Sequence, residues 1–242
     1  MVQNVFNSYE KKYLLSKEQY EALRRRMAPY MEEDAYGLHT IRNIYYDTDT
    51  DELIRTSLDK PQYKEKFRVR CYGTPKEDSP IFLEIKKKYR GLVNKRRAVL
   101  SQKEARAYLE QGVRPMKYTQ ILKEIDYFLH SHNAVPKVYL AYDRVALFGK
   151  EDAEFRVTFD TNIRYRNDDL KLENDSDTTM LQGRGFYLME VKILNAMPLW
   201  FAHLLDEMEI RSISFSKYGT AYKKNLQNGY YSYVDERSVR VC

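Results

Sequence analysis

Residues 63–72, YKEKFRVRCY, alternate between two kinds of side chain from one position to the next. This period of two predicts an extended strand, because successive side chains of a strand point to opposite faces. One face carries Lys64, Lys66, Arg68 and Arg70, and the other carries Glu65, Phe67, Val69 and Cys71. One face of this strand is therefore entirely basic.

The same alternation, bounded by turn residues, predicts seven further strands. The eight strands are expected at residues 5–15, 40–47, 63–72, 81–89, 92–100, 137–148, 155–164 and 185–193. Charged side chains recur on one face of several of these strands. They include Glu84, Lys86 and Lys88 in one strand, Arg156 and Asp160 in another, and Glu190 and Lys192 in the last.

Helices are expected between some of the strands. Ser16 and Ser101 are placed to cap helices at 17–27 and 102–111, with Gly112 ending the second, and Asp49 or Thr50 to cap a short helix at 51–58. Further helices are expected at 119–132 and 198–210, a polar loop at 170–184, and residues 214–225 follow the last helix. No linker divides the chain, so we expect one domain over residues 1–242, of the α+β class.

The charged faces leave two arrangements open. In an open sheet they would simply meet water. Alternatively, helices cover the apolar faces, and the eight antiparallel strands close into a β-barrel, a tunnel with a polar, basic lumen and the helices packed outside. We favour the barrel because the apolar faces need helices to cover them.

Such a lumen would contain more positive than negative charge. Its cations would be Lys12, Lys66, Arg68, Arg70, Lys86, Lys95, Arg97, Arg144 and Arg156, and its carboxylates Glu10, Glu84, Asp160 and Glu190. Two like charges about 6 Å apart repel by roughly 3 kcal/mol at an effective dielectric constant of about 20. The lumen therefore favours a polyanion with many oxygen atoms as its ligand.

Composition limits the other function classes. The chain has 242 residues and a net charge of +6, which favours an anionic partner. Cys71 and Cys242 form neither a CxxC pair nor a disulfide framework. No signal peptide and no apolar run of about 18 residues is present, so we expect a cytoplasmic protein without a membrane span.

Familiar site motifs are absent. Asp47, Asp49 and Asp51 resemble the start of a calcium loop, but the glycine and glutamate that such a loop requires are replaced by Glu52 and Leu58. No P-loop, GxGxxG motif or metal-binding histidine spacing occurs. The basic residues alternate with glutamates along several strands instead of forming a tail or a helix face, so we do not expect a nucleic-acid partner.

Ten motifs in order resemble the VTC (vacuolar transporter chaperone) polyphosphate polymerase domain, a branch of the CYTH, or triphosphate tunnel metalloenzyme, superfamily. They are YEKKYLL (9–15), NIYYDT (43–48), KFRVRCYG (66–73), LEIKKK (83–88), KRR (95–97), YDRVAL (142–147), FRVTFD (155–160), LMEVK (188–192), PLW (198–200) and SFSKY (214–218). The resemblance spans nearly the whole chain. It departs from the family at Ser8, where an arginine is frequent, and at Ser214, where some members have a lysine.

The resemblance implies an eight-stranded tunnel that binds a triphosphate or polyphosphate on basic walls. It implies that Arg68, Arg70, Lys86, Arg144 and Arg156 contact the reacting phosphates. Together with the face analysis, it makes Lys12, Lys66, Lys95, Arg97, Tyr142, Ser216 and Lys217 candidates for substrate binding. Glu190 would hold Mn²⁺ or Mg²⁺, with Glu10, Glu84 and Asp160 as further candidates.

The function that we infer from this resemblance is transfer of the γ-phosphate of ATP to a growing polyphosphate chain. The partners would be ATP, polyphosphate, and diphosphate or phosphate. Two alternatives stay open: a triphosphatase or polyphosphatase, in which water replaces the acceptor, and a noncatalytic polyphosphate-binding module that docks onto a membrane-protein partner.

Overall fold

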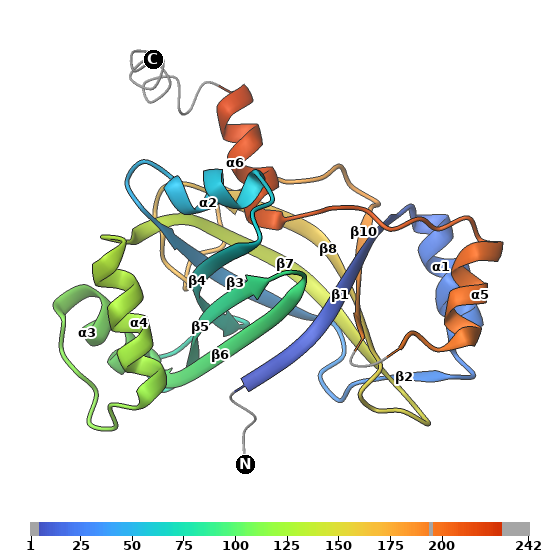
Figure 1. The fold of residues 1–242 in the computed structure, drawn as a ribbon, viewed down its shortest axis with the longest axis horizontal. Helices are drawn as coiled ribbons and strands as arrows, with labels where there is room; N and C mark the ends of the chain where they lie inside the picture. The colour runs from blue at the N-terminus through green and yellow to red at the C-terminus, as the bar shows by residue number, and fades with distance from the viewer. Residues whose placement is uncertain (1–4, 194–195, 229–242) are drawn as a thin grey trace.

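The computed structural model describes residues 5–193 and 196–228, in which ten strands form one antiparallel sheet (Figure 1). The strands are β1 Val5–Leu15, β2 Met31–Glu33, β3 His39–Asp47, β4 Tyr63–Tyr72, β5 Pro80–Tyr89, β6 Leu92–Ser101, β7 Val135–Gly149, β8 Arg156–Arg166, β9 Thr179–Met180 and β10 Tyr187–Ile193. The helices are α1 Lys17–Met27, α2 Glu52–Leu58, α3 Gln102–Gln111, α4 Gln120–Ser131, α5 Leu199–Glu207 and α6 Lys217–Gln227. The predicted α+β class and its large antiparallel sheet are confirmed.

The strand order explains how residues far apart in sequence come together. The order is β2-β7-β3-β4-β5-β6-β1-β10-β8-β9, and β7 also pairs with β8. Each of the eight long strands therefore has a paired neighbour on both sides. The register sets Glu84 of β5 opposite Arg68 of β4 and Arg97 of β6, and sets Lys12 of β1 opposite Glu190 of β10.

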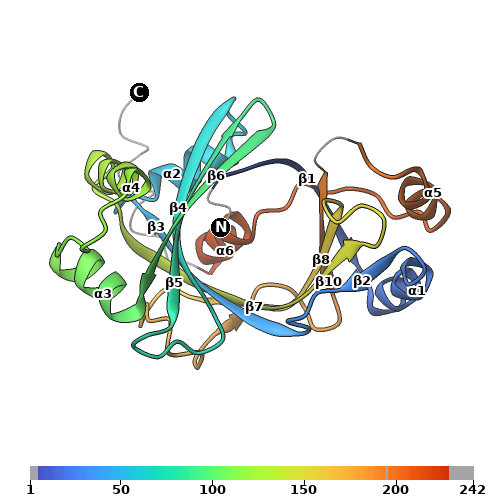
Figure 2. The same cartoon turned by 90° about the horizontal axis from the view of Figure 1, so that it is seen from below.

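The apolar faces of the strands are covered by helices on two flanks (Figure 2). On one flank, Phe67 and Leu83 belong to a buried cluster with Phe128 of α4. On the other, Val157 and Met189 belong to a cluster with Phe201 of α5. The predicted alternation therefore holds, and the charged faces lie on the opposite side of the sheet.

The prediction that all helices pack outside is wrong for α6. In Figure 1, α6 lies above the strands beside α2, and in Figure 2, viewed from below, it appears framed by the strands. Tyr218, Ala221 and Tyr222 of α6 belong to one buried cluster with Tyr45 of β3 and Tyr142 of β7. The sequence did not predict this helix. The apolar residues of SFSKYGTAYKKN pack against inner faces of the strands, and we expected those faces to carry charged side chains.

The start of α2 also differs from the prediction. Neither Asp49 nor Thr50 caps it; the capping position is Asp51, which has φ 58° and makes no capping bond from its side chain. The first N–H groups of α2 instead donate to Thr48 and Asp47, upstream of the helix. In contrast, the predicted caps Ser16 and Ser101 both form capping boxes, and Gly112 ends α3 with φ 69°.

Two short strands escaped prediction, because β2 and β9 have 3 and 2 residues and show no period. β9 lies within the predicted loop 170–184. That loop is held by Arg166, whose guanidinium donates to several backbone carbonyls between residues 168 and 176. Across the described part of the chain, the helices fall short of the length and apolarity that a membrane crossing requires.

Candidate functional site

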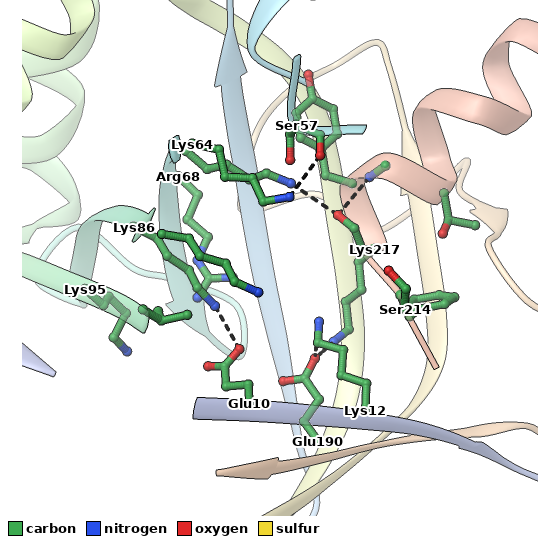
Figure 3. Close-up of a pocket in the computed structure, with 18 of the residues that line it drawn as sticks. Glu10, Lys12, Ser57, Lys64, Arg68, Lys86, Lys95, Glu190, Ser214 and Lys217 are labelled. Atoms are coloured by element: carbon green, nitrogen blue, oxygen red, sulfur yellow. Dashed lines mark hydrogen bonds and ion pairs between the residues drawn. The ribbon is translucent and has the colours of Figure 1, made fainter. Parts of the chain in front are cut away.

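A cavity of about 830 Å³ lies between the inner faces of the strands and the ends of α2 and α6 (Figure 3). Its described lining contains eleven lysines and four arginines but only four glutamates. Polar side chains from β1, β4, β5 and β10 and from α6 point into the same space in Figure 3. The cavity is therefore strongly electropositive, as the charged faces predicted.

Among the described carboxylates, Glu84 has the most cationic side chains within 4.0 Å. Its side chain is 1% exposed and accepts hydrogen bonds from Arg68 at 2.8 Å and Arg97 at 2.6 Å. Arg70 lies at 3.7 Å and Lys95 at 3.5 Å. Burial alone would raise the pKa of Glu84, but these four positive charges hold it well below its ordinary value. Glu84 is thus ionised, yet it can neutralise only one of the four cations.

Neutral groups fix the two arginines beside Glu84. Arg68 donates to the Tyr45 hydroxyl at 3.0 Å. Arg70 donates to Asn43 Oδ1 and to the Tyr142 hydroxyl, both at 2.9 Å. A guanidinium held on several sides is preorganised for bidentate contact with an oxyanion.

A second network joins α6 to β1, β7, β8 and β10. Lys217 Nζ lies 2.8 Å from Glu190 and 2.5 Å from Asp160. Arg144 donates to Asp160 at 2.6 Å and contacts Glu190 at 3.3 Å, while Lys12 is 3.2 Å from Glu190. Burial would raise the pKa of Glu190, but Lys12, Lys217 and Arg144 outweigh it and hold the pKa well below its ordinary value.

Other cations of the cavity have no carboxylate within 4.0 Å among the described residues. This holds for Lys64, Lys66, Lys192 and Arg156, whereas Lys86 pairs with Glu10 at 2.9 Å. Burial, reinforced by neighbouring cations, lowers the pKa of Lys66 to about 7 and that of Lys192 to about 8. These groups would gain most from a bound anion.

Most predicted site residues line this cavity. They are Lys12, Lys66, Arg68, Arg70, Lys86, Lys95, Tyr142, Arg144, Arg156, Ser216 and Lys217, with Glu10, Glu84 and Glu190. Arg97 and Asp160 do not line it and lie behind it, paired with Glu84 and with Arg144, respectively.

Lys64 and Lys192 also line the cavity, although they were not among the predicted site residues. Their positions on the charged faces could have identified them. Lys60 and Lys223 line it as well, but they lie outside the strands, so alternation gave no signal for them.

Ser216 and Lys217 depend on α6. The Ser216 hydroxyl accepts from the N–H of Gly219 at 3.2 Å and caps the helix, and Lys66 donates to the same hydroxyl at 3.2 Å. The start of a helix also favours negative charge, because its first N–H groups lack partners in the helix. α6 therefore adds a lysine and a helix start to the cavity wall.

The fit to a divalent metal ion depends on a bound phosphate. No group of three or more His, Cys, Asp or Glu side chains suited to a metal occurs in the described ranges. Glu190 offers a carboxylate, and Thr158, directly opposite it in the sheet, has a buried hydroxyl without a described partner. These oxygens fit Mg²⁺ or Mn²⁺ only if phosphate oxygens complete the coordination, as is usual for Mg²⁺.

Comparison with known proteins agrees with this geometry. The sequence signature of the VTC domain matches residues 7–226. Subunit 4 of the vacuolar transporter chaperone complex of Trypanosoma brucei brucei (strain 927/4 GUTat10.1) is 24% identical over an alignment of 217 residues, and the match covers 74% of this chain. The aligned region covers 27% of that protein, so this chain spans about a quarter of its relative.

Two solved structures share the fold at low identity. A Bacillus halodurans protein described provisionally as an adenylate cyclase has a TM-score of 0.54 at 15% identity, covering 88% of this chain and 96% of its own. A provisional adenylyl cyclase of Hippeastrum, described as having a dominant triphosphatase activity, also gives 0.54, at 14% identity, covering 90% and 96%.

We predict that removing one cavity guanidinium weakens polyanion binding. Arg68→Ala should weaken tripolyphosphate binding by about 1.5–3 kcal/mol, because a charge-assisted hydrogen-bond pair is lost. Arg96→Ala is the matched control, since Arg96 pairs with Glu124 and does not line the cavity. Titration calorimetry measures both variants. Equal affinity of Arg68→Ala and wild type would place Arg68 outside the binding surface.

Tripolyphosphate binding should also take up protons, and more at pH 8 than at pH 6. Lys66 is mostly neutral at pH 8 in the free protein because its pKa is about 7, and a bound anion raises that pKa and favours the charged form. Calorimetry in buffers of different ionisation enthalpy measures the uptake. Lys66→Arg keeps the charge without titrating and should reduce it. Uptake that is equal at both pH values would contradict the prediction.

Proposed function

The chain belongs to the VTC domain family, and from this premise we propose that it transfers the γ-phosphate of ATP to a growing inorganic polyphosphate chain. The observation that supports the proposal most is the excess of positive charge in the cavity. Lys64, Lys66, Arg156 and Lys192 line it without a described carboxylate partner, and a polyanion would supply the missing negative charge.

The resemblance to subunit 4 of a vacuolar transporter chaperone complex supports the same proposal. Because this chain spans about a quarter of that subunit, we extend only the phosphate chemistry of the matched region. The relative is named as part of a complex, so we propose that this chain also works with partner subunits, on the cytoplasmic side of a membrane protein.

In the proposed reaction, the protein positions phosphates and stabilises charge. The γ-phosphorus accepts an oxygen of the acceptor chain's terminal phosphate, and its bond to the β-phosphate oxygen breaks, so ADP leaves. In-line phosphoryl transfer needs little more than alignment and neutralisation of the equatorial oxygens. Arg68, Arg70, Lys86, Arg144 and Arg156 would supply that neutralisation. An acceptor terminus that is already ionised needs no general base.

We propose that the ring of paired strands acts as a closed tunnel around the bound chain. The pairing of β7 with β8 supports this proposal, because it would complete a continuous wall around the cavity. A tunnel filled by the acceptor leaves little room for competing water. Mn²⁺ or Mg²⁺, held by Glu190 together with phosphate oxygens, would screen the negative charge of the reacting groups.

We predict that the protein with ATP and Mn²⁺ releases ADP without matching orthophosphate and makes polymer visible on a polyphosphate-stained gel. Added short polyphosphate should shorten an initial lag, because it serves as acceptor.

Glu190→Gln should abolish turnover but keep metal-free tripolyphosphate binding, since it removes the charge that a hard cation requires. Glu124→Gln, outside the cavity, is the matched control.

The other outcomes distinguish the alternatives. Orthophosphate equal to ADP, with no polymer, would reject the polymerase in favour of a hydrolase. Binding of tripolyphosphate without any ADP release would favour a noncatalytic module. Wild-type turnover of Glu190→Gln at limiting Mn²⁺ would remove Glu190 from the metal site.

A further inference from the structure

Asp47 ends β3 in the motif NIYYDT and makes no contact with the cavity. It is fully buried, and four groups donate to its carboxylate. Oδ1 accepts from the N–H groups of Thr48 at 2.8 Å and Leu53 at 2.9 Å. Oδ2 accepts from the N–H of Ile54 and from the hydroxyl of Tyr218, both at 2.9 Å. One carboxylate therefore connects β3, the start of α2 and the first turn of α6.

Capping α2 does not explain all of these contacts. A capping side chain ordinarily supplies one acceptor oxygen to a helix start, and Ser, Thr or Asn does this as well as Asp. α2 already has such an acceptor in Thr48, which receives the N–H of Glu52 at 2.9 Å. Tyr218 lies 171 residues from Asp47 in the sequence, and its hydroxyl donates to Oδ2, the oxygen that also accepts from Ile54 of α2.

Tyr218 immediately follows Ser216 and Lys217, two of the polar residues that the start of α6 brings to the cavity. Its ring stacks on Tyr45 with centroids 5.1 Å apart and an interplanar angle of 26°. Tyr45 in turn receives the hydrogen bond from Arg68. Tyr218 is therefore placed to hold its neighbours Ser216 and Lys217 at the cavity. Through its contact with Tyr45, it is also connected to Arg68, one of the arginines around Glu84.

We propose that Asp47 is a positioning residue: by accepting the hydrogen bond of Tyr218, it holds the first turn of α6 at the cavity so that Ser216 and Lys217 reach a bound phosphate. The part of this inference that concerns phosphate rests on the proposed function. The hold on α6 itself rests on the contacts alone.

Two variants break the same hydrogen bond from opposite sides. Tyr218→Phe keeps the ring and its stacking but removes the donor, and Asp47→Ala removes both acceptor oxygens. Tyr139→Phe is the matched control, because Tyr139 also donates to a carboxylate, Asp175, at 2.9 Å, but lies in the cluster outside the cavity.

The first measurement is amide hydrogen exchange over residues 217–224, without phosphate. Tyr218→Phe should speed exchange there by about tenfold, the loss expected for one hydrogen bond to a charged acceptor, and Asp47→Ala by at least as much. Tyr139→Phe should leave these amides unchanged. Exchange in both variants equal to wild type would overturn the inference, whether or not the protein binds phosphate.

The second measurement is tripolyphosphate affinity together with melting temperature. Both variants should bind about tenfold more weakly, and the double variant no more weakly than Asp47→Ala, which already lacks the bond from Tyr218. A merely structural role would lower the melting temperature and leave affinity unchanged, which would overturn the inference if wild type binds. Failure of wild type to bind would instead reject the proposed function, and hydrogen exchange would still decide the hold on α6.

Discussion

The ion pairing of Glu84 determines how the rest of the cavity is built. One fully buried carboxylate serves Arg68, Arg70, Lys95 and Arg97, so it cannot neutralise them all. Removing charged groups from water is costly unless partners compensate them. The protein meets part of this cost with neutral acceptors such as Tyr45 and Asn43. The polyanion that we propose as ligand would bring further negative charge.

The sheet makes this sharing feasible because it fixes the register of its strands. Arg68, Glu84 and Arg97 stand side by side on three adjacent strands, so their contacts need no long-range adjustment. A slip of one residue would turn these side chains toward the apolar clusters. The apolar faces, packed under α3 and α4 on one flank and α1 and α5 on the other, therefore also protect the geometry of the charged faces.

The period of two in the sequence was sufficient to predict the eight long strands and the faces that carry Lys66, Glu84 and Glu190. Its success has a physical cause, because burial on one face imposes alternation on every strand. The short strands β2 and β9 contain too few residues to show a period. The pairing of Glu190 with Lys217 could not be derived either, since it joins residues whose proximity depends on the whole fold.

α6 is the clearest case of information that local sequence does not contain. Its tyrosines pack against inner faces of the strands, and Lys217 and Lys223 line the cavity, so the segment lacks the apolar stripe of a helix on an outer surface. Only the resemblance to the VTC domain pointed to Ser216 and Lys217. The hydrogen bond from Tyr218 to Asp47 joins the motif SFSKY at the start of α6 to the motif NIYYDT at the end of β3.

The central claim is that the excess positive charge of the cavity is matched by a bound polyanion. A crystal structure of the protein with tripolyphosphate tests it most directly. We expect phosphate groups inside the cavity, within hydrogen-bond distance of Lys66, Arg156 and Lys192, three of the cations that lack a described carboxylate. Tripolyphosphate bound only on the outer surface, with these three side chains unchanged, would contradict it.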